Sequence, residues 1–342
     1  LEKAQQEAET ALQLDPHTLR GARLHRGVVL WRQGKLDDAL TELTEAKKAE
    51  PRSVPTLVTL AAVQIDKGHA TPEDKPAEAS NHFKEAEVNL TMALKSEPSN
   101  AEANFHMAMV KTAQVKAQVK AARAKAIKEK ADPETVPAGD FSQAIESMRV
   151  AVDRAPKRAD YRYAFGALYR DAKQLPEAIK EWQEAVKLEP KMADAHEALG
   201  LAHLERGEFD EALTAFQATL KAEPKRTRVF AAIGNTHFNA THWREAVRAY
   251  EQALKADPGL TGVFYKIGRA WSEQNQYGKA IDWYVKATKV EPVEPETWYH
   301  LGFAYKEKGK KKDAIKAFQE YLGRKPEAVD RKEVEDEISF LE

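Results

Sequence analysis

The stretch WYHLGFAYKEKGKKKDAIKAFQEYLGRKP, residues 298–326, decides how the chain folds. It places Gly302, Ala314, Phe318 and Pro326 at intervals that recur throughout the sequence. The 34-residue interval is clearest for proline, at Pro156, Pro190, Pro224, Pro258, Pro292 and Pro326. A fixed period of this length indicates stacked repeats. Because proline removes a backbone donor and disfavours the helical conformation in the residue before it, each repeat is predicted to be two amphipathic helices that end at the proline.

Small and large residues recur between the prolines. Glycine stands at Gly166, Gly200, Gly234, Gly268 and Gly302, with alanine twelve residues after each. Glycine inside a helix costs about 1 kcal/mol relative to alanine, so we expect these glycines to permit close approach of the second helix through that alanine. A large residue four positions after the alanine is then expected to fill the adjacent hole, and it is Trp182, Phe216, Tyr250, Tyr284 or Phe318.

The signature Trp298, Leu301, Gly302, Tyr305, Ala314, Phe318 and Pro326 closely resembles that of the tetratricopeptide repeat family. The resemblance implies an all-α fold, a right-handed α-α superhelix of about eight 34-residue repeats over residues 19–326 in one solenoid. Residues 1–18 match only the second helix of a truncated repeat, so we expect the sequence to be a fragment of a longer protein. Residues 327–342 have one apolar helical face and are predicted to form a capping helix, which shields the last repeat.

Two insertions interrupt the period, near residues 69–81 and 111–138, and both fall at turns between paired helices. The first is predicted to be a loop, with the following helix extended back to Pro76. The second contains neither glycine nor proline from Ala101 to Ala131. A single helix of about 30 residues is therefore predicted there.

The second insertion is basic. Residues 111–130 carry seven basic residues and one acid, a charge near +6 in a chain of net charge −1. One interpretation is a solvated helix that lies on the neighbouring insertion through a thin apolar stripe. The other is an electrostatic docking edge for an acidic partner, with candidate residues Lys116, Lys120, Arg123 and Lys130. Nucleic acid and anionic lipid are disfavoured because the segment has no aromatic residue to stack on bases or to anchor in a bilayer.

The composition narrows the possible functions. With Lys+Arg 53 against Asp+Glu 54, no overall charge attracts the chain to nucleic acid or to an anionic membrane. The chain has no cysteine, which excludes disulfides, thiol catalysis and cysteine metal sites. No apolar run approaches the length of a membrane span. We expect a soluble protein, cytoplasmic or periplasmic, and the sequence does not distinguish these compartments.

The motifs predict no catalytic, cofactor or metal site. The sequence has no glycine-rich phosphate loop, no G-x-S-x-G elbow and no H-E-x-x-H pair. His203 and His237 stand at positions that are aromatic in other repeats, which favours packing or hydrogen bonding over metal binding. We therefore expect a non-catalytic protein without a small-molecule substrate.

In the resembled family, first-helix residues around the packing glycine line a concave face. Carried over by position, this face comprises Trp31, Phe105, Met109, Tyr163, Arg170, Leu204, Asn235, Phe238, Asn239, Tyr265, Arg269, Tyr299, Phe303 and Lys306, with Leu24, Val28, Val58, Ile65 and Leu201 beside them. Aromatic and arginine side chains dominate binding energy at interfaces. The resemblance thus implies a protein-protein interaction scaffold that binds a peptide, a helix or a protein loop in the concave groove.

Two specialised grooves of the family are not predicted. The carboxylate clamp of chaperone-binding members is matched at Asn235, but its other slots hold Ala231, Lys266, Glu296 and His300. The asparagine ladder of O-GlcNAc transferase is missing as well. Two functional alternatives stay open: the regulatory or substrate-recruiting arm of an enzyme whose catalytic domain lies outside this sequence, and a scaffold that self-associates into a larger complex.

Overall fold

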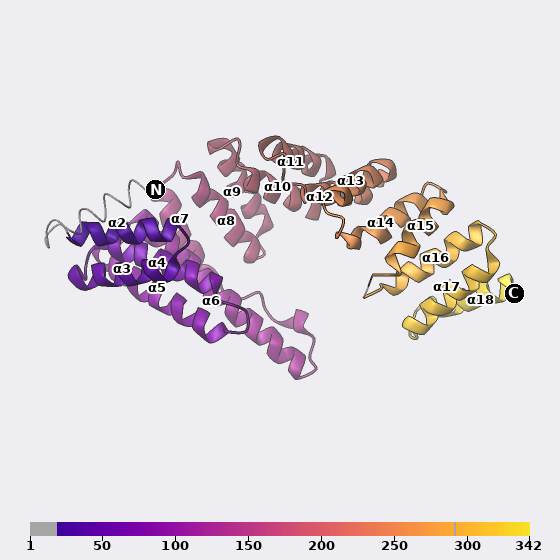
Figure 1. Ribbon diagram of the computed structural model, residues 1–342, viewed down its shortest axis with the longest axis horizontal. Helices are drawn as coiled ribbons and strands as arrows, with labels where there is room; N and C mark the ends of the chain where they lie inside the picture. Colours follow the sequence, from indigo (N-terminus) through magenta and orange to yellow (C-terminus); the bar gives the residue numbers. More distant parts are fainter. Residues whose placement is uncertain (1–18, 291) are drawn as a thin grey trace. The chain divides into compact units, whose positions relative to one another are not determined.

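Regular structure within residues 19–290 and 292–342, the part that this computed structural model describes, is entirely helical (Figure 1). This confirms the predicted all-α repeat fold. Contacts divide the chain into two compact units, Leu1–Pro190 and Lys191–Glu342, which we describe separately. The helix predicted within residues 1–18 lies outside the described residues.

The described residues of the first unit, 19–190, form four helix pairs, in which each first helix, here called the A helix, packs on the following B helix. The pairs are α2 (Leu19–Arg32) with α3 (Leu36–Ala49), α4 (Val54–Ala70) with α5 (Pro76–Ser96), α6 (Ala101–Lys128) with α7 (Ser142–Arg154), and α8 (Ala159–Asp171) with α9 (Leu175–Leu188). A short 3-10 helix, η1 (Pro133–Thr135), lies between α6 and α7. The A helices α2, α4 and α6 also contact one another in sequence.

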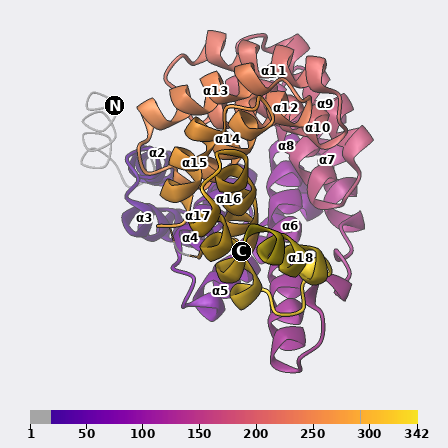
Figure 2. The same ribbon diagram turned by 90° about the vertical axis from the view of Figure 1, so that its right-hand side faces the viewer.

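The second unit has four further pairs and a last single helix. They are α10 (Ala193–Glu205) with α11 (Phe209–Ala222), α12 (Val229–Asn239) with α13 (Trp243–Ala256), α14 (Phe264–Ser272) with α15 (Tyr277–Ala287), and α16 (Pro295–Glu307) with α17 (Lys311–Arg324). The 3-10 helix η2 (Thr261–Val263) precedes α14. The last helix, α18 (Arg331–Leu341), packs on α17 at the C-terminal end (Figure 2) and buries Val334 and Leu341.

The glycine in the A helix makes room for the large side chain of the B helix. A Cβ atom on Gly302 would lie 2.5 Å from Cε1 of Phe318, and one on Gly268 would lie 2.6 Å from Cδ1 of Tyr284. The prediction that glycine receives the alanine of the B helix is therefore wrong. Ala314 is fully buried, but it is the ring that lies against the glycine.

Two repeats of the first unit pack without this glycine. They carry Ala61 and Ala108 in its place, and the large position holds Leu90 and Met148. All four side chains are almost completely buried. An extra methyl group on the A helix thus accompanies a smaller, more flexible partner on the B helix, which keeps the interior filled.

The insertions of the first unit are largely helical. Helix α5 starts at Pro76, and α6 runs for 28 residues, as predicted (Figure 1). A Cβ on Gly139, whose φ is +95°, would lie 2.5 Å from Val115 and 3.0 Å from Val119, so this part of the apolar stripe of α6 packs on the returning chain. None of the described helices combines the length and hydrophobicity needed to cross a membrane.

Candidate functional site

The first unit contains a cavity of about 600 Å³ bordered by three A helices, α4, α6 and α8. Its lining includes the apolar side chains of Phe83, Met109, Ala113, Met148, Ala164, Ala167 and Leu168. Met109 and Tyr163, which the sequence assigns to the concave face, both line it. A second cavity of about 600 Å³ adjoins the first beneath the 71–75 loop, and Phe83 and Ala117 line both. The first cavity is thus bordered mainly by A helices, whereas the second lies between α5 and α6.

The polar lining of the cavity carries both signs of charge. The Nζ atom of Lys116 lies 3.1 Å from a carboxylate oxygen of Asp171, and that of Lys120 lies 3.3 Å from Glu73. His69 packs edge-on against Phe83, with ring centroids 5.2 Å apart. Desolvation lowers the pKa of His69, Asp66 opposes this shift, and Lys116 adds to it. The lowered pKa favours the neutral imidazole, and the charges of Lys116 and Lys120 are paired with Asp171 and Glu73.

The same ion pairs change the interpretation of the basic segment. Lys111 donates to Glu87 of α5 at 2.6 Å, and Arg123 lies 4.0 Å from Glu134 of η1. With the pairs of Lys116 and Lys120, acids that are distant in the sequence offset much of the charge near +6 predicted for the isolated segment. Lys130 is exposed beyond the end of α6. The predicted basic edge is therefore largely a set of ion pairs between neighbouring elements.

Other predicted concave residues of the first unit are engaged inside it. Trp31 donates from Nε1 to Asp66 at 2.6 Å, and the ring of Phe105 stacks on Tyr161 with centroids 4.3 Å apart. Val58 and Ile65 are buried, which corrects their assignment to an open surface. Leu24 and Val28 are partly buried. By contrast, Arg170 is exposed and lies over Trp182, with 6.0 Å between the guanidinium carbon and the ring centroid.

In the second unit, a polar cluster forms where α12, α14 and α16 present neighbouring side chains. We define the central polar cluster as Asn235, Tyr265, Lys266, Arg269 and His300. Lys266 donates from Nζ to Oδ1 of Asn235 at 2.7 Å, and Arg269 donates from Nη1 to Nε2 of His300 at 3.1 Å. The same Nη1 lies 3.4 Å from the hydroxyl of Tyr265. Desolvation, aided by Arg269, lowers the pKa of His300 to about 4, so this histidine accepts a hydrogen bond as a neutral ring.

The capping helix covers the end of the A-helix face of the second unit. Tyr299 and Phe303 pack against the core cluster that includes Val334 and Leu341 of α18. Lys306 donates to Glu337 of α18 at 2.5 Å. These three residues, which the sequence assigns to the concave face, are therefore already in contact with α18.

The remaining predicted residues of the second unit lie nearer its start. Leu204 packs on the core around Phe216, and Phe238 lies edge-on to Trp243 at 5.2 Å between ring centroids. Asn239 and Leu201 are exposed. Leu201 and Asn239 are thus the more accessible of the predicted positions on α10 and α12.

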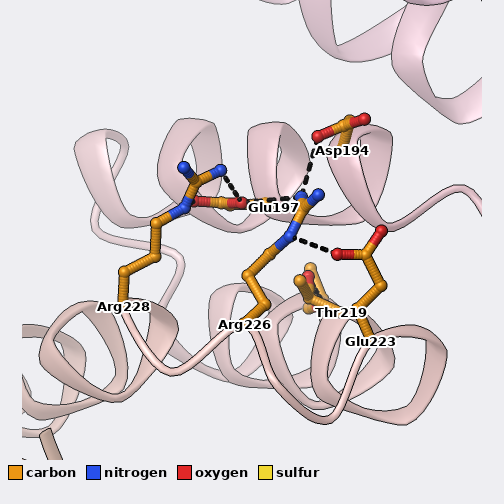
Figure 3. A network of polar contacts seen from close by, with 7 residues as sticks. Asp194, Glu197, Thr219, Glu223, Arg226 and Arg228 are labelled. Carbon is orange, nitrogen blue, oxygen red and sulfur yellow. Dashed lines mark hydrogen bonds and ion pairs between the residues drawn. The ribbon is translucent and has the colours of Figure 1, made fainter. Parts of the chain in front are cut away.

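An arginine network that sequence reasoning missed ties the loop before α12 to α10 (Figure 3). Arg226 donates to Asp194 at 2.8 Å, to Glu197 at 2.9 Å and to Glu223 at 2.9 Å. Arg228 binds both carboxylate oxygens of Glu197, at 2.9 and 2.8 Å. Bidentate pairing of this kind fixes geometry as well as charge. All partners are acids of the same unit, so the network stabilises the loop.

The two singled-out histidines have different surroundings. His203 shares a hydrogen bond of 2.6 Å with Glu208, in line with the predicted role. His237 lies 5.9 Å from the ring of His242, and desolvation together with His242 lowers its pKa. Within the described parts of the chain, no three histidine or acidic side chains converge as metal ligands would.

Comparison with protein families gives matches over most of this architecture. A Tetratricopeptide repeat model matches residues 1–54, 137–186, 163–226 and 231–288. A TPR repeat model matches residues 268–309, and another Tetratricopeptide repeat model matches residues 295–327. The matched residues make up more than half of the chain. A search of curated protein sequences found no match.

Solved structures of repeat proteins are also similar. YrrB, a TPR protein with an unusual peptide-binding site, aligns with a TM-score of 0.51 and 17% identity over 56% of this chain and 99% of its own. A tetratricopeptide repeat protein from Parabacteroides merdae aligns with a TM-score of 0.49 and 15% identity over 84% and 98%. A thermophilic TPR protein from Thermus thermophilus aligns with a TM-score of 0.45 and 21% identity over 64% of this chain and 98% of its own. At these identities, the match to YrrB supports the repeat fold alone.

Proposed function

We propose a specific mode of binding for this chain, which belongs to the tetratricopeptide repeat family. The family supports a role as a protein-interaction scaffold. Beyond that, we propose that a peptide, helix or loop of a partner protein docks on the A-helix side of the units, and that the chain itself is non-catalytic. Because the helices are preformed, binding orders only the partner, which limits its entropic cost.

The observation that carries this proposal is the cavity between α4, α6 and α8. Its volume of about 600 Å³ and its apolar lining are suited to one or two large apolar side chains of a partner. Full burial of one such side chain stabilises a complex by about 1.5–3 kcal/mol. The ion pairs of Lys116 and Lys120 are placed to contact the backbone of the same segment.

The name of YrrB refers to a peptide-binding site in that protein. The similarity concerns the fold, so our proposal for a ligand rests on the geometry of this chain. A protein or peptide ligand agrees with the near-zero net charge, which attracts neither nucleic acid nor an anionic membrane. The paired charges around Lys116 and Lys120 give no separate support to docking through the basic segment.

A random peptide library displayed on phage tests the proposal. Ala167 lines the cavity, so the variant Ala167→Trp should block it. The control is Leu188→Trp, an exposed position on the B helix α9 that lines neither cavity. We expect peptides that bind the wild type and the control but bind Ala167→Trp about tenfold more weakly or not at all.

The selected peptides should depend on one apolar residue. Its replacement by alanine should weaken binding by about tenfold or more, as for a hot-spot side chain. Circular dichroism and thermal unfolding verify that both tryptophan variants are folded. If every peptide binds Ala167→Trp as tightly as it binds the wild type, the cavity is not the docking site.

A further inference from the structure

The A-helix side of the second unit holds a lysine, Lys266, to which the described residues offer no acidic partner. Lys266 is partly buried, and in the described part of the chain no carboxylate lies within 4.0 Å of its Nζ atom. Its hydrogen bond goes to the amide oxygen of Asn235, which also accepts from the hydroxyl of Tyr250 at 2.9 Å. By contrast, Lys306 on α16 of the same unit is paired with Glu337 at 2.5 Å.

A second cation lies one helical turn from Lys266. Arg269 follows it by three residues on α14, a spacing that places both side chains on the same face of the helix. Its contacts within the central polar cluster are neutral: the hydroxyl of Tyr265 and the ring of His300. Its acidic partner is Glu273 at 3.1 Å, whose side chain is 41% exposed. Among the described residues, the two neighbouring cations thus have one carboxylate close by, the partly exposed Glu273, and it pairs with Arg269.

The positive charge of Lys266 and Arg269 is only partly compensated within the unit, which favours a negatively charged ligand. Desolvation lowers the pKa of Lys266, which reflects how poorly its charge is compensated in the unliganded protein. An ammonium group has three donors, and the bond to Asn235 uses one of them. A carboxylate between Lys266 and Arg269 would accept charge-assisted hydrogen bonds, which are stronger than bonds between neutral groups.

We propose that Lys266 and Arg269 bind an aspartate or glutamate side chain of the partner segment. This inference rests on the proposed function, because its ligand is a peptide on the A-helix side, and it adds the chemistry recognised in the second unit. The residues differ from the carboxylate clamp of chaperone-binding repeats, since Glu296 and His300 stand where that clamp has its last cations. A side-chain carboxylate is therefore the expected ligand, and not the C-terminal one.

The test uses synthetic peptides from phage selection on the wild-type chain, all with amidated C-termini. Each acidic residue is compared with its amide, Glu with Gln and Asp with Asn, by fluorescence polarisation. On the wild type, we expect one acidic position at which the amide weakens binding by about tenfold. Lys266→Met should reduce that preference to less than about twofold, and added salt should reduce it in the wild type.

Two further variants make the result specific. Lys266→Arg retains the charge and should retain most of the preference, whereas Lys255→Met removes an exposed lysine of α13 and should leave it unchanged. Circular dichroism confirms that the variants are folded. An acid preference that is equal in the wild type and in Lys266→Met overturns the inference, as does a set of peptides without any acid preference.

The remaining outcomes are also decisive. Peptides that bind only with a free C-terminus would assign the cations to a terminal carboxylate, and peptides that bind only when phosphorylated would assign them to phosphate. Both results contradict a side-chain carboxylate. If selection on the wild type yields no binding peptide, the proposed function itself fails and this inference fails with it.

Discussion

The two units solve the same packing problem with different residues. In the second unit, each A-helix glycine faces a ring on the B helix, as Gly302 faces Phe318. In two repeats of the first unit, alanine faces an aliphatic side chain, as Ala61 accompanies Leu90. In these pairs a larger residue on the A helix accompanies a smaller one on the B helix, which keeps the interface filled. Gly27 of the first unit is an exception, because a Cβ there would lie 2.6 Å from Cγ of Leu43.

The units also differ in what they leave open. Insertions in the first unit create apolar cavities ringed by paired charges, whereas the second unit leaves the cations of the central polar cluster incompletely compensated. A regular period thus specifies the core, and departures from it leave the cavities and the partly compensated cations that we propose as binding sites.

The largest expected effect concerns the buried histidines of the A helices. It tests whether burial lowers the pKa of a histidine in the first unit as it does in the second. Burial lowers the pKa of His106 in the first unit to about 4, as it does for His300 in the second, and the nearby Arg158 contributes. The unfolded value is about 6.5, so the unfolded chain takes up the proton first as the pH falls. The stability that the neutral ring provides is thus present above pH 6.5 and lost between pH 6.5 and 4, to a total of about 3 kcal/mol at most.

Urea unfolding of the wild type and His106→Gln at several pH values measures this loss. The difference in unfolding free energy between the two proteins should change across that pH window. Glu102, 4.0 Å from the imidazole, is 63% exposed, so solvent screens its charge. A difference that stays constant from pH 7 to pH 4 would show that His106 ionises normally.

The next effect directly tests the comparison between glycine paired with a ring and alanine paired with an aliphatic side chain. Gly302→Ala places a methyl group against Phe318 and should destabilise the second unit by about 2 kcal/mol through overpacking. Phe318→Leu alone should also destabilise it, because a cavity remains. The double variant recreates the pair found at Ala61 and Leu90 and should be more stable than the sum of the single effects predicts. Additive unfolding free energies would refute this account of the pairs.

A smaller effect compares the same substitution at a position that borders the cavity and at a position inside the packed core. Ala113 lines the cavity of the first unit, whereas Ala280 is fully buried in the second. Ala280→Leu should cost about 1–3 kcal/mol through overpacking. Ala113→Leu should change the unfolding free energy by less than about 1 kcal/mol, because its added atoms enter the cavity. Equal costs in thermal unfolding would mean that the cavity does not accept a leucine side chain.

The smallest effect concerns the basic segment. The side chains of Lys120 and Glu73 are 72% and 92% exposed, so their ion pair should contribute little. We expect Lys120→Ala to change stability by less than about 0.5 kcal/mol. Native-state hydrogen exchange of α6 provides the measurement. A loss of more than about 1 kcal/mol would instead make this pair a structural clamp on the insertion.

The sequence predicts the helices well because their signals are local or strictly periodic. The prolines mark helix ends, and the glycines and rings mark the contact between paired helices. Which small residue faces the ring depends on the rotation of the two helices about their axes. That rotation explains why Gly302 contacts Phe318 and not Ala314, the contact that the sequence pattern predicts.

The candidate site is predicted less completely. Met109 and Tyr163 line the cavity, whereas Phe105 lies against Tyr161 and Val58 is buried. The partners of the basic segment, such as Asp171, are far away in the sequence, so a count of charges along the chain cannot include them. Cavities depend on how insertions pack, which a 34-residue period does not encode.

Methionine-methyl NMR tests the central claim most directly, since the chain has 5 methionines. Met109 and Met148 line the cavity of the first unit, whereas Met192 lies just before α10 in the second. On titration with a peptide that discriminates against Ala167→Trp, we expect the methyl signals of Met109 and Met148 to shift and that of Met192 to remain in place. Binding that shifts only Met192, or leaves Met109 and Met148 unchanged, would contradict docking in the A-helix cavity.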